Sequence, residues 1–129
     1  MRAVIDASAL LAHLLDEPGK ERVLEALQDE SVMSVVNFAE VATRLVRGGA
    51  DEALLRELAA ELPVEFVQPD EEVAIRAALM FRVASRAGLS LGDRICLATG
   101  QVMGLPVVTA DRVWAEVALA IAVELVVVR

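Results

Sequence analysis

The sequence predicts an α/β protein, a three-layer α/β/α sandwich in which helices cover both faces of a central parallel sheet. Short apolar segments alternate along the chain with longer segments that have helical periodicity. The short segments are apolar at almost every position instead of every second one, which is typical of strands buried on both faces. Strands that alternate with helices in this way form a parallel sheet.

The chain length predicts a single domain that spans residues 1–129. A chain of 129 residues can bury a core without disulfides or structural metal ions. Its one cysteine, Cys96, cannot form an internal disulfide, and one cysteine with one histidine provides too few ligands for a structural zinc site. We therefore expect that any bound metal ion is held by oxygen atoms.

In the first half of the chain, two short apolar segments predict strands and three longer segments predict helices. Ser8 or Asp6 can cap the first helix, and Pro18 suits the first turn of the second. Gly48 and Gly49 end the third helix. The predicted elements are, in order, a strand at 2–6, a helix at 8–16, a helix at 18–28, a strand at 31–35 and a helix at 37–47.

The second half continues the alternation and adds three more strands. Asp51 begins a helix that Pro63 ends, and the acidic residues 70–72 suit the first turn of a long helix that Gly88 caps. The predicted elements are a helix at 51–62, a strand at 64–67, a helix at 70–87, a helix at 91–103, a strand at 106–109, a short helix from 112 and a strand at 122–128.

The apolar content does not predict a membrane protein. Although 57% of the residues are hydrophobic, the longest stretch without a charge, residues 95–110, contains two glycines and Pro106 and is too short to span a bilayer. Met1 and Arg2 lead directly into the first strand, without the features of a signal peptide. We therefore expect a cytoplasmic protein with no membrane partner.

The charge balance argues against a protein that holds nucleic acid by a broad basic surface. The formal net charge is -8, whereas phosphate binding by general attraction requires a basic face. A nucleic-acid substrate would therefore have to be bound locally, by metal ions in an acidic cleft and by arginines. Lys20 is the only lysine, so the basic side chains are almost all arginines.

Four acidic residues stand at the ends of apolar segments. Asp6 and Asp111 each follow a predicted strand, and Glu40 and Asp93 lie near the starts of two predicted helices. In a parallel sheet, ligands gather beyond the carboxyl ends of the strands, and the helix N-termini point to the same edge. Several carboxylates brought together at this edge would bind a hard divalent cation.

Each acid also has a purely structural interpretation. Asp6 and Asp111 suit the N-caps of the helices that follow them, and Asp93 stands three residues after Ser90, which is the spacing of a capping box. Glu40 lies on the polar side of its helix, where it could pair with Arg44. Helix 91–103, however, is apolar nearly all round, so an acid in it suggests more than a solvated surface residue.

Taken in order, the segments around these acids resemble those of the PIN domain, specifically the VapC-type toxin ribonucleases of bacterial toxin–antitoxin pairs. The resemblance extends over the whole chain and includes all four acids. Its motifs are Val4-Ile5-Asp6-Ala7-Ser8-Ala9-Leu10, Asn37-Phe38-Ala39-Glu40-Val41, Leu89-Ser90-Leu91-Gly92-Asp93 and Val108-Thr109-Ala110-Asp111.

This resemblance implies an α/β/α sandwich and an endoribonuclease that cleaves RNA phosphodiesters with a water molecule activated by Mg²⁺ or Mn²⁺. It also implies that Asp6 and Asp93 bind the metal ion directly, and that Glu40 and Asp111 complete the acidic cluster directly or through water. Ser8 or Thr109 would orient a ligand or a water molecule.

Two arginines, Arg94 and Arg112, are each adjacent in sequence to a proposed ligand and are candidates for contacting phosphate. A helix residue beside a ligand, however, points about 100° away from it. The structure must therefore decide whether either side chain reaches the acidic edge.

Two alternative functions remain. The first is a catalytically degenerate PIN-like module that binds a protein partner, which the intact set of acids disfavours. The second is a phosphoryl-transfer domain of the aspartyl-phosphate kind, which requires a second acid two residues after Asp6 or a lysine late in the sheet. Ser8 stands at the first of these positions and no lysine follows Lys20.

The resemblance further implies a cognate antitoxin whose C-terminal segment covers the cleft, with a basic side chain among the acids. The apolar helices at 8–28 and 37–47 are the expected binding surface for this antitoxin, or for a second copy of the chain in a homodimer.

Overall fold

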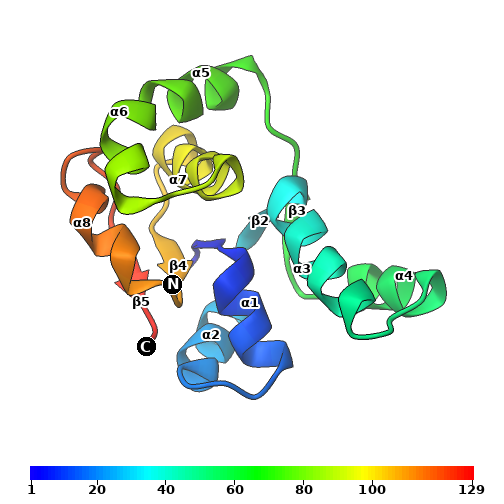
Figure 1. Ribbon diagram of the computed structural model, residues 1–129. Coiled ribbons are helices and arrows are strands. Elements are labelled where there is room, and N and C mark those ends of the chain that lie inside the picture. Colours follow the sequence, from blue (N-terminus) through cyan, green and yellow to red (C-terminus); the bar gives the residue numbers. More distant parts are fainter.

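The computed structural model of the chain describes all of residues 1–129 and contains one five-stranded sheet (Figure 1). The strand order is β3-β2-β1-β4-β5, and every neighbouring pair is parallel. The predicted parallel sheet is therefore confirmed. Its strands are β1 (Val4–Ile5), β2 (Val32–Ser34), β3 (Glu65–Val67), β4 (Val107–Thr109) and β5 (Leu125–Val127).

Helices cover both faces of the sheet and divide the core in two. Val4, Val32 and Val107 face one cluster of buried side chains, which α5, α6, α7 and α8 complete. The next residue of each strand faces the other cluster, which α1, α2 and α3 complete. The helices are α1 (Ala7–Leu14), α2 (Lys20–Leu27), α3 (Val35–Arg47), α4 (Glu52–Glu61), α5 (Glu71–Leu79), α6 (Phe81–Ala84), α7 (Leu91–Met103) and α8 (Ala115–Ala118), with short 3₁₀ turns η1 (Ser85–Ala87) and η2 (Arg112–Trp114).

Most predicted elements are present, with small shifts at their ends. Helix α7 has the predicted bounds. Helix α3 begins two residues earlier than predicted, because Ser34 at the end of β2 caps it by accepting a hydrogen bond from the backbone N–H of Val36. Helix α2 begins two residues later, because Gly19 adopts a left-handed conformation with φ of 95°.

The prediction of one continuous helix at 70–87 is wrong, because this segment breaks at Met80 into α5, α6 and η1. One turn before the break, the carbonyl of Ala77 accepts a hydrogen bond of 2.9 Å from Nη1 of Arg94 in α7. A side chain that inserts into the hydrogen bonds of a helix bends it. The predicted cap at Gly88 is confirmed by its left-handed backbone.

Helix α4 lies at the outer end of α3, away from the sheet (Figure 1). None of its residues is buried, and Val46 and Leu54 expose about half of their surface. This apolar surface is a candidate for contact with a partner. None of the helices is both long enough and apolar enough to cross a membrane.

Candidate functional site

The four predicted acids lie at the edge of the sheet where the parallel strands end. Asp6 directly follows β1, Asp111 lies two residues beyond β4, and Glu40 is carried by α3, which follows β2. Asp93 lies in the first turn of α7, which leads back to the start of β4 and so begins at the same edge. The charges of Glu40 and Asp93 act on Asp6, and the charge of Asp111 acts on Asp93. We call these four residues the carboxylate cluster.

Asp6 is the most buried of the four, with 2% of its surface exposed. Its Oδ2 accepts hydrogen bonds from Oγ of Ser8 at 2.5 Å and from Oγ1 of Thr109 at 2.9 Å. Both hydroxyls in turn accept backbone N–H groups, Ser8 from Ala110 and Thr109 from Asp111. The two hydroxyls that the sequence suggested as supporting groups therefore hold Asp6 between the ends of β1 and β4.

Glu40 is held by Asn37, a residue to which the sequence analysis gave no role. The buried side-chain amide of Asn37 donates to Oε1 of Glu40 at 2.7 Å and to the carbonyl of Gly92 at 3.1 Å. It thus ties α3 to the first turn of α7. The expected ion pair of Glu40 with Arg44 is not formed. Only the presence of Asn37 and Gly92 inside the recognised motifs could have drawn attention to them.

Gly92 leaves room for the Glu40 carboxylate. A Cβ atom at position 92 would lie 2.6 Å from Oε1 of Glu40 and 3.0 Å from Oε2. These separations are shorter than van der Waals contact, so any side chain at this position would displace the carboxylate.

Asp93 and Asp111 also have the capping roles predicted for them. Asp93 and Ser90 form a reciprocal capping box at the start of α7, in which Oδ2 of Asp93 accepts the backbone N–H of Ser90. Asp111 accepts the backbone N–H of Val113, and Asp6 accepts that of Ser8. The structural interpretation is therefore confirmed for all three aspartates, and it coexists with their position at one edge.

Each carboxylate of the cluster leaves one oxygen without a hydrogen bond to the protein. The engaged atoms are Oδ2 of Asp6, Oε1 of Glu40, Oδ2 of Asp93 and Oδ1 of Asp111. The four remaining oxygens are the hard donors that Mg²⁺ and Mn²⁺ prefer. Oδ1 of Asn37 is in addition buried without a hydrogen-bond partner.

The carboxylates have the right donor atoms for a metal ion but do not lie close enough together to coordinate one. As the side chains lie, no three histidine, cysteine, aspartate or glutamate side chains converge closely enough to hold a metal ion. Carboxylates repel one another when no cation neutralises them. The donor set therefore fits a divalent cation, and binding requires these side chains to move closer together.

Burial and mutual repulsion both oppose ionisation of the cluster. Burial raises the pKa of Asp6 to about 7, and the charges of Asp93 and Glu40 add to this rise, while hydrogen bonds from Ser8 and Thr109 counteract it. Burial also raises the pKa values of Glu40 and Asp93. Acidic groups with raised pKa values that gather at one edge are typical of a functional site.

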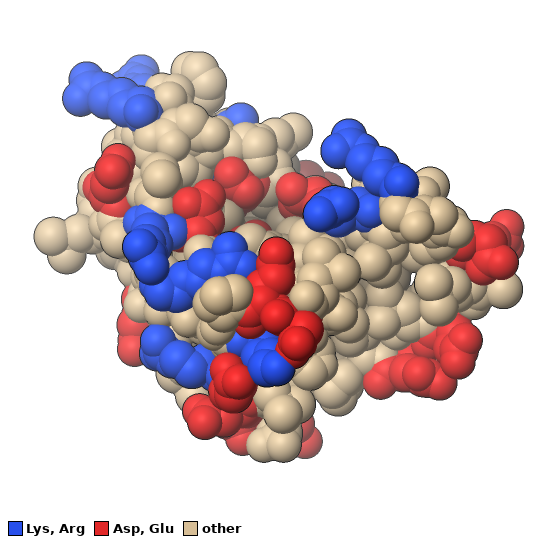
Figure 2. Space-filling model, turned by 60° about the horizontal axis from the view of Figure 1, so that its bottom comes forward, with Lys and Arg blue, Asp and Glu red and all other residues tan.

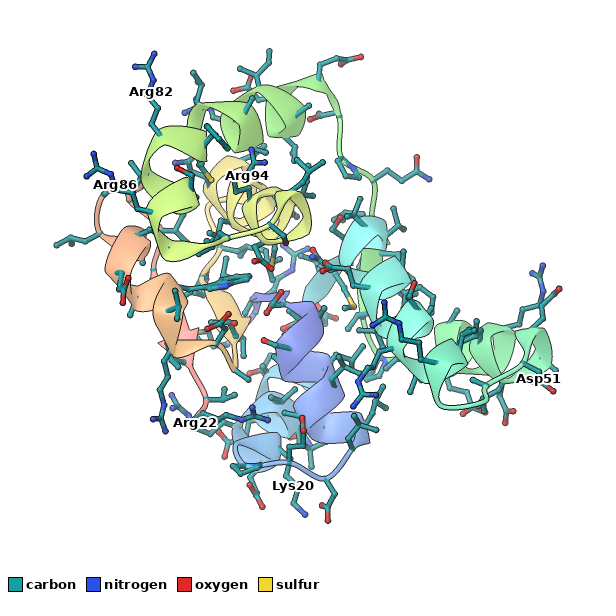
Figure 3. The ribbon with its side chains drawn as sticks, in the orientation of Figure 1. Lys20, Arg22, Asp51, Arg82, Arg86 and Arg94 are labelled. Atoms are coloured by element: carbon teal, nitrogen blue, oxygen red, sulfur yellow. The ribbon has the colours of Figure 1, made fainter.

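The two arginines that the sequence singled out lie in different surroundings. The guanidinium of Arg94 lies between α7 and α5 (Figure 3), where it donates to the carbonyl of Ala77 and its carbon Cζ lies 5.5 Å from the ring centre of Phe81. Arg112 instead lines a groove that also contains Ser8 and Asp111. Only Arg112 therefore lies beside the carboxylate cluster.

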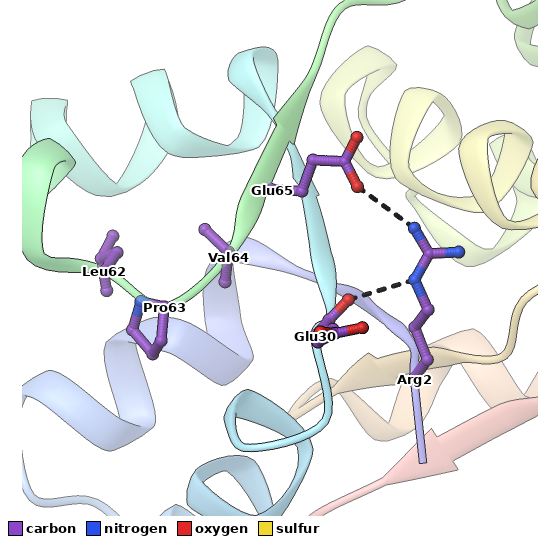
Figure 4. A pocket seen from close by; sticks show the side chains of 6 residues that line it. All are labelled: Arg2, Glu30, Leu62, Pro63, Val64 and Glu65. Carbon is purple, nitrogen blue, oxygen red and sulfur yellow. Dashed lines mark hydrogen bonds and ion pairs between the residues drawn. The ribbon is translucent and has the colours of Figure 1, made fainter.

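The pocket in Figure 4 is larger but lies at the opposite edge of the sheet. It is lined by Arg2, Glu30, Glu65 and the segment 62–64, which precede or begin strands. Arg2 donates to the carbonyl of Glu30 and to the carboxylate of Glu65, at 3.1 Å in each case. Since its one basic side chain already pairs with Glu65 and it contains none of the four acids, we do not assign the function to it.

Comparisons with known proteins agree with this fold. The family model of the PIN domain matches residues 3–120. The Ribonuclease VapC of Mycolicibacterium smegmatis is 37% identical over 112 residues, which cover 80% of this chain and 86% of that protein. VapBC-5 of Mycobacterium tuberculosis, a member of the VapBC family of toxin-antitoxin systems, aligns with a TM-score of 0.68 and 23% identity over 98% of both chains. The DNA-bound VapBC of Salmonella typhimurium aligns with a TM-score of 0.75 and 14% identity over 100% of this chain and 99% of that chain.

The protein is thus an α/β/α sandwich with a carboxylate cluster at the edge where its parallel strands end. Because the family model covers most of the sequence and a relative with high coverage is 37% identical, the chain belongs to the PIN-domain family. The resemblance inferred from the four motifs is thereby confirmed, as is the predicted fold class.

Proposed function

We propose that this chain is a Mg²⁺- or Mn²⁺-dependent endoribonuclease and the toxin of a toxin–antitoxin pair. The observation that carries the proposal is the carboxylate cluster, in which four acids from separate parts of the sequence each keep one oxygen free. Membership of the PIN-domain family and the similarity to a protein named as a ribonuclease support it.

In this proposal, Asp6 and Asp93 bind the cation directly, and Glu40 and Asp111 complete its surroundings directly or through water. A bound Mg²⁺ or Mn²⁺ would act as a Lewis acid that lowers the pKa of a water molecule and offsets the charge that develops on the leaving oxygen. Ser8 and Thr109 hold the Asp6 carboxylate in a fixed orientation. Asn37 does the same for Glu40.

Burial raises the pKa of Asp6 to about 7. At neutral pH, a substantial fraction of the metal-free protein keeps a proton on Asp6. This proton must leave before Asp6 can bind a cation, so cation binding releases protons.

The proposal is tested by incubating the purified chain with total RNA in Mg²⁺ or in EDTA. We expect cleavage in Mg²⁺ that is lost in EDTA and in the Asp6→Asn variant. Glu57→Gln, which removes an exposed carboxylate of α4 that forms no ion pair, should cleave like the wild type. Cleavage that persists in EDTA and in Asp6→Asn would contradict the proposal.

One observation favours a second candidate, a degenerate PIN-like module that binds a protein partner. No three acidic side chains converge on a common point as they lie. A module of this kind would cleave no RNA and would gain no stability from added Mn²⁺. The same incubation, combined with a melting curve in Mn²⁺, therefore separates the two functions.

We further propose a cognate antitoxin as the protein partner, which covers the cleft and contacts the helices at 8–28 and 37–47. These helices and the start of α4 expose several large apolar side chains, namely Leu15, Leu24, Val46 and Leu54. A second copy of the chain in a homodimer is the other candidate for this surface. Limited proteolysis of a co-purified complex should protect these helices, and an unchanged cleavage pattern would contradict the assignment.

A further inference from the structure

Two open grooves flank the carboxylate cluster, and each contains one of its acids together with two arginines. One groove, of about 500 Å³, runs along α3 and is lined by Val36, Ala39, Glu40, Thr43, Arg44 and Arg47. The other, of about 420 Å³, is lined by Ser8, Ala110, Asp111, Arg112 and Arg129. We call them the α3 groove and the η2 groove.

The strand order places the two grooves on opposite sides of Asp6. Helix α3 follows β2, and Asp111 follows β4, while β1 lies between these two strands and ends at Asp6. Neighbouring strands are about 4.8 Å apart, so β2 and β4 are separated by roughly 10 Å. The shortest path from one groove to the other therefore crosses the cluster.

The arginines of the grooves have free hydrogen-bond donors. Arg44 and Arg47 are exposed and form neither a hydrogen bond nor an ion pair with another side chain. Arg112 uses only Nε, which donates to the carbonyl of Arg129 at 3.2 Å, and its terminal amino groups remain free. Arg129 differs, because it pairs with Glu17 at 3.0 Å. Three guanidinium groups can thus receive a ligand without breaking an existing ion pair.

The chemistry of these side chains favours phosphate groups as the ligand. The planar guanidinium donates two parallel hydrogen bonds to a phosphate or carboxylate. The protein has a net charge of -8, and on the face shown in Figure 2 the basic side chains lie in separate groups among acidic ones, without a continuous basic surface. A polyanion must therefore be held at a few points, which is what the two grooves provide.

We propose that a single strand of RNA crosses the carboxyl edge of the sheet, with its backbone phosphates bound by Arg44 and Arg47 in the α3 groove and by Arg112 in the η2 groove. This inference rests on the proposed ribonuclease function and adds the path of the substrate. The strand must be single because Asp6, at the middle of the path, has only 2% of its surface exposed. A flexible strand can bend toward a recessed group, whereas a duplex cannot.

The inference is tested by the binding of a fluorescent single-stranded oligoribonucleotide of mixed sequence, with Ca²⁺ in place of Mg²⁺ and intact RNA verified on a gel. The variants are Arg112→Gln and the double variant Arg44→Gln/Arg47→Gln. The matched control is Arg82→Gln/Arg86→Gln, since these two arginines also lack an ion pair and extend from the outer side of α6 and η1 (Figure 3). Melting curves verify that each variant is folded.

We expect both groove variants to weaken binding by roughly fivefold or more, and the control to bind like the wild type. The slope of log K against log salt should become less negative by about 0.7 for Arg112→Gln and by about 1.4 for the double variant, because each phosphate contact on a single strand contributes about 0.7. An effect in only one groove would overturn the crossing path.

The outcomes also separate this inference from the proposed function. If the wild type cleaves RNA in Mg²⁺ while the groove variants bind like the control, the path is wrong and the ribonuclease function stands. If the wild type neither cleaves nor binds RNA, both fail. If the groove variants keep their affinity for RNA but no longer co-purify with the antitoxin, the grooves bind the protein partner and the inference is overturned.

Discussion

Glu40 owes its position to two neighbours that carry no charge. Asn37 donates a hydrogen bond to one of its oxygens, and Gly92 leaves the space that the carboxylate occupies. Neither neighbour has a carboxylate that could bind a metal ion. Their contribution is to hold an acid of α3 beside the first turn of α7, and it can be tested separately from the chemistry.

Gly92→Ala should impair the site without destabilising the fold. The three atoms nearest to the new Cβ all belong to the end of the Glu40 side chain, not to the backbone, and alanine is favoured over glycine in a helix by about 1 kcal/mol. We expect an unchanged or raised melting temperature, together with a loss of RNA cleavage and of stabilisation by Mn²⁺. Gly48→Ala is the control, because a Cβ there would have its nearest contact at 3.4 Å, to the backbone of Leu45. Full activity of Gly92→Ala would show that the position of Glu40 is not critical.

The raised pKa of Asp6 predicts how the stability of the metal-free protein depends on pH. Burial raises this pKa to about 7, from an ordinary value of 3.8. Between these values, the folded state keeps a proton that the unfolded state loses, so the free energy of unfolding falls as the pH rises from about 4 to about 7. The contribution of Asp6 is fully present below pH 4 and is lost above pH 7.

Asp6→Asn should remove this dependence, because asparagine does not titrate. The difference in unfolding free energy between the variant and the wild type, measured with urea in EDTA, should grow in favour of the variant by about 2–4 kcal/mol between pH 4 and pH 7. Using the difference cancels the titration of the groups that do not interact with Asp6, which leaves Asp6 and its coupling to Asp93 and Glu40. A difference that stays constant across this range would mean that Asp6 ionises normally in the folded protein.

The contrast between Asp93 and Asn37 illustrates what could be predicted at the level of residues. The capping box of Asp93 depends on a partner three residues away, so its spacing is visible in the sequence. Asn37 joins Glu40, three residues away, to the carbonyl of Gly92, which is 55 residues away. Ser8 and Thr109, which are 101 residues apart, also meet on Asp6. Such contacts depend on the folded chain, and only the family resemblance drew attention to these segments.

At the level of elements, Arg94 connects α7 to the bend between α5 and α6. Its guanidinium donates to the carbonyl of Ala77 and stacks near Phe81, and its Nε is buried without a partner. The residue therefore has a structural role in this protein, in contrast to Arg112, whose terminal amino groups are free.

Arg94→Met should destabilise the protein without weakening its affinity for RNA. Methionine keeps an apolar side chain but loses the hydrogen bond and the cation–π contact, and together these should cost about 1–3 kcal/mol. Urea unfolding measures the stability, and oligoribonucleotide binding under native conditions measures the affinity. Arg112→Gln should give the opposite result, with unchanged stability and weaker binding. Weaker binding by a stable Arg94→Met protein would instead assign Arg94 to the substrate.

The hydrogen bond from Arg94 to the carbonyl of Ala77 also explains why the break between α5 and α6 could not be predicted from the sequence. Strand and helix periodicity, with caps such as Ser90 and Gly88, identified almost every element, because these signals are local. The segment 70–87 has no glycine or proline inside it, so nothing local predicts the break at Met80. The hydrogen bond to Ala77 comes from α7, which lies later in the chain. Long-range contacts of this kind override local helical preference.

At the scale of the whole molecule, the protein has excess negative charge and concentrates part of it at one edge of the sheet, where only Asp6 is buried. Its net charge is -8, and burial raises the pKa values of three acids in the carboxylate cluster. These raised values mean that the charged cluster opposes folding when no cation is present. A ligand that binds only the folded state would relieve this repulsion and stabilise the whole protein.

Mn²⁺ should therefore raise the melting temperature of the wild type. The increase should exceed the one that nonspecific screening of the protein's negative charge would produce. At a concentration of about a hundred times Kd, one bound ion adds about 2.7 kcal/mol, which corresponds to roughly 10 °C for a domain of this size. Asp93→Asn should melt at a higher temperature than the wild type in EDTA, because it removes a repelling charge, and should respond little to Mn²⁺. Glu57→Gln removes the same charge from exposed α4 and should respond like the wild type. Equal responses in all three proteins would mean that Mn²⁺ acts on the overall charge, and that the four carboxylates do not form a metal site.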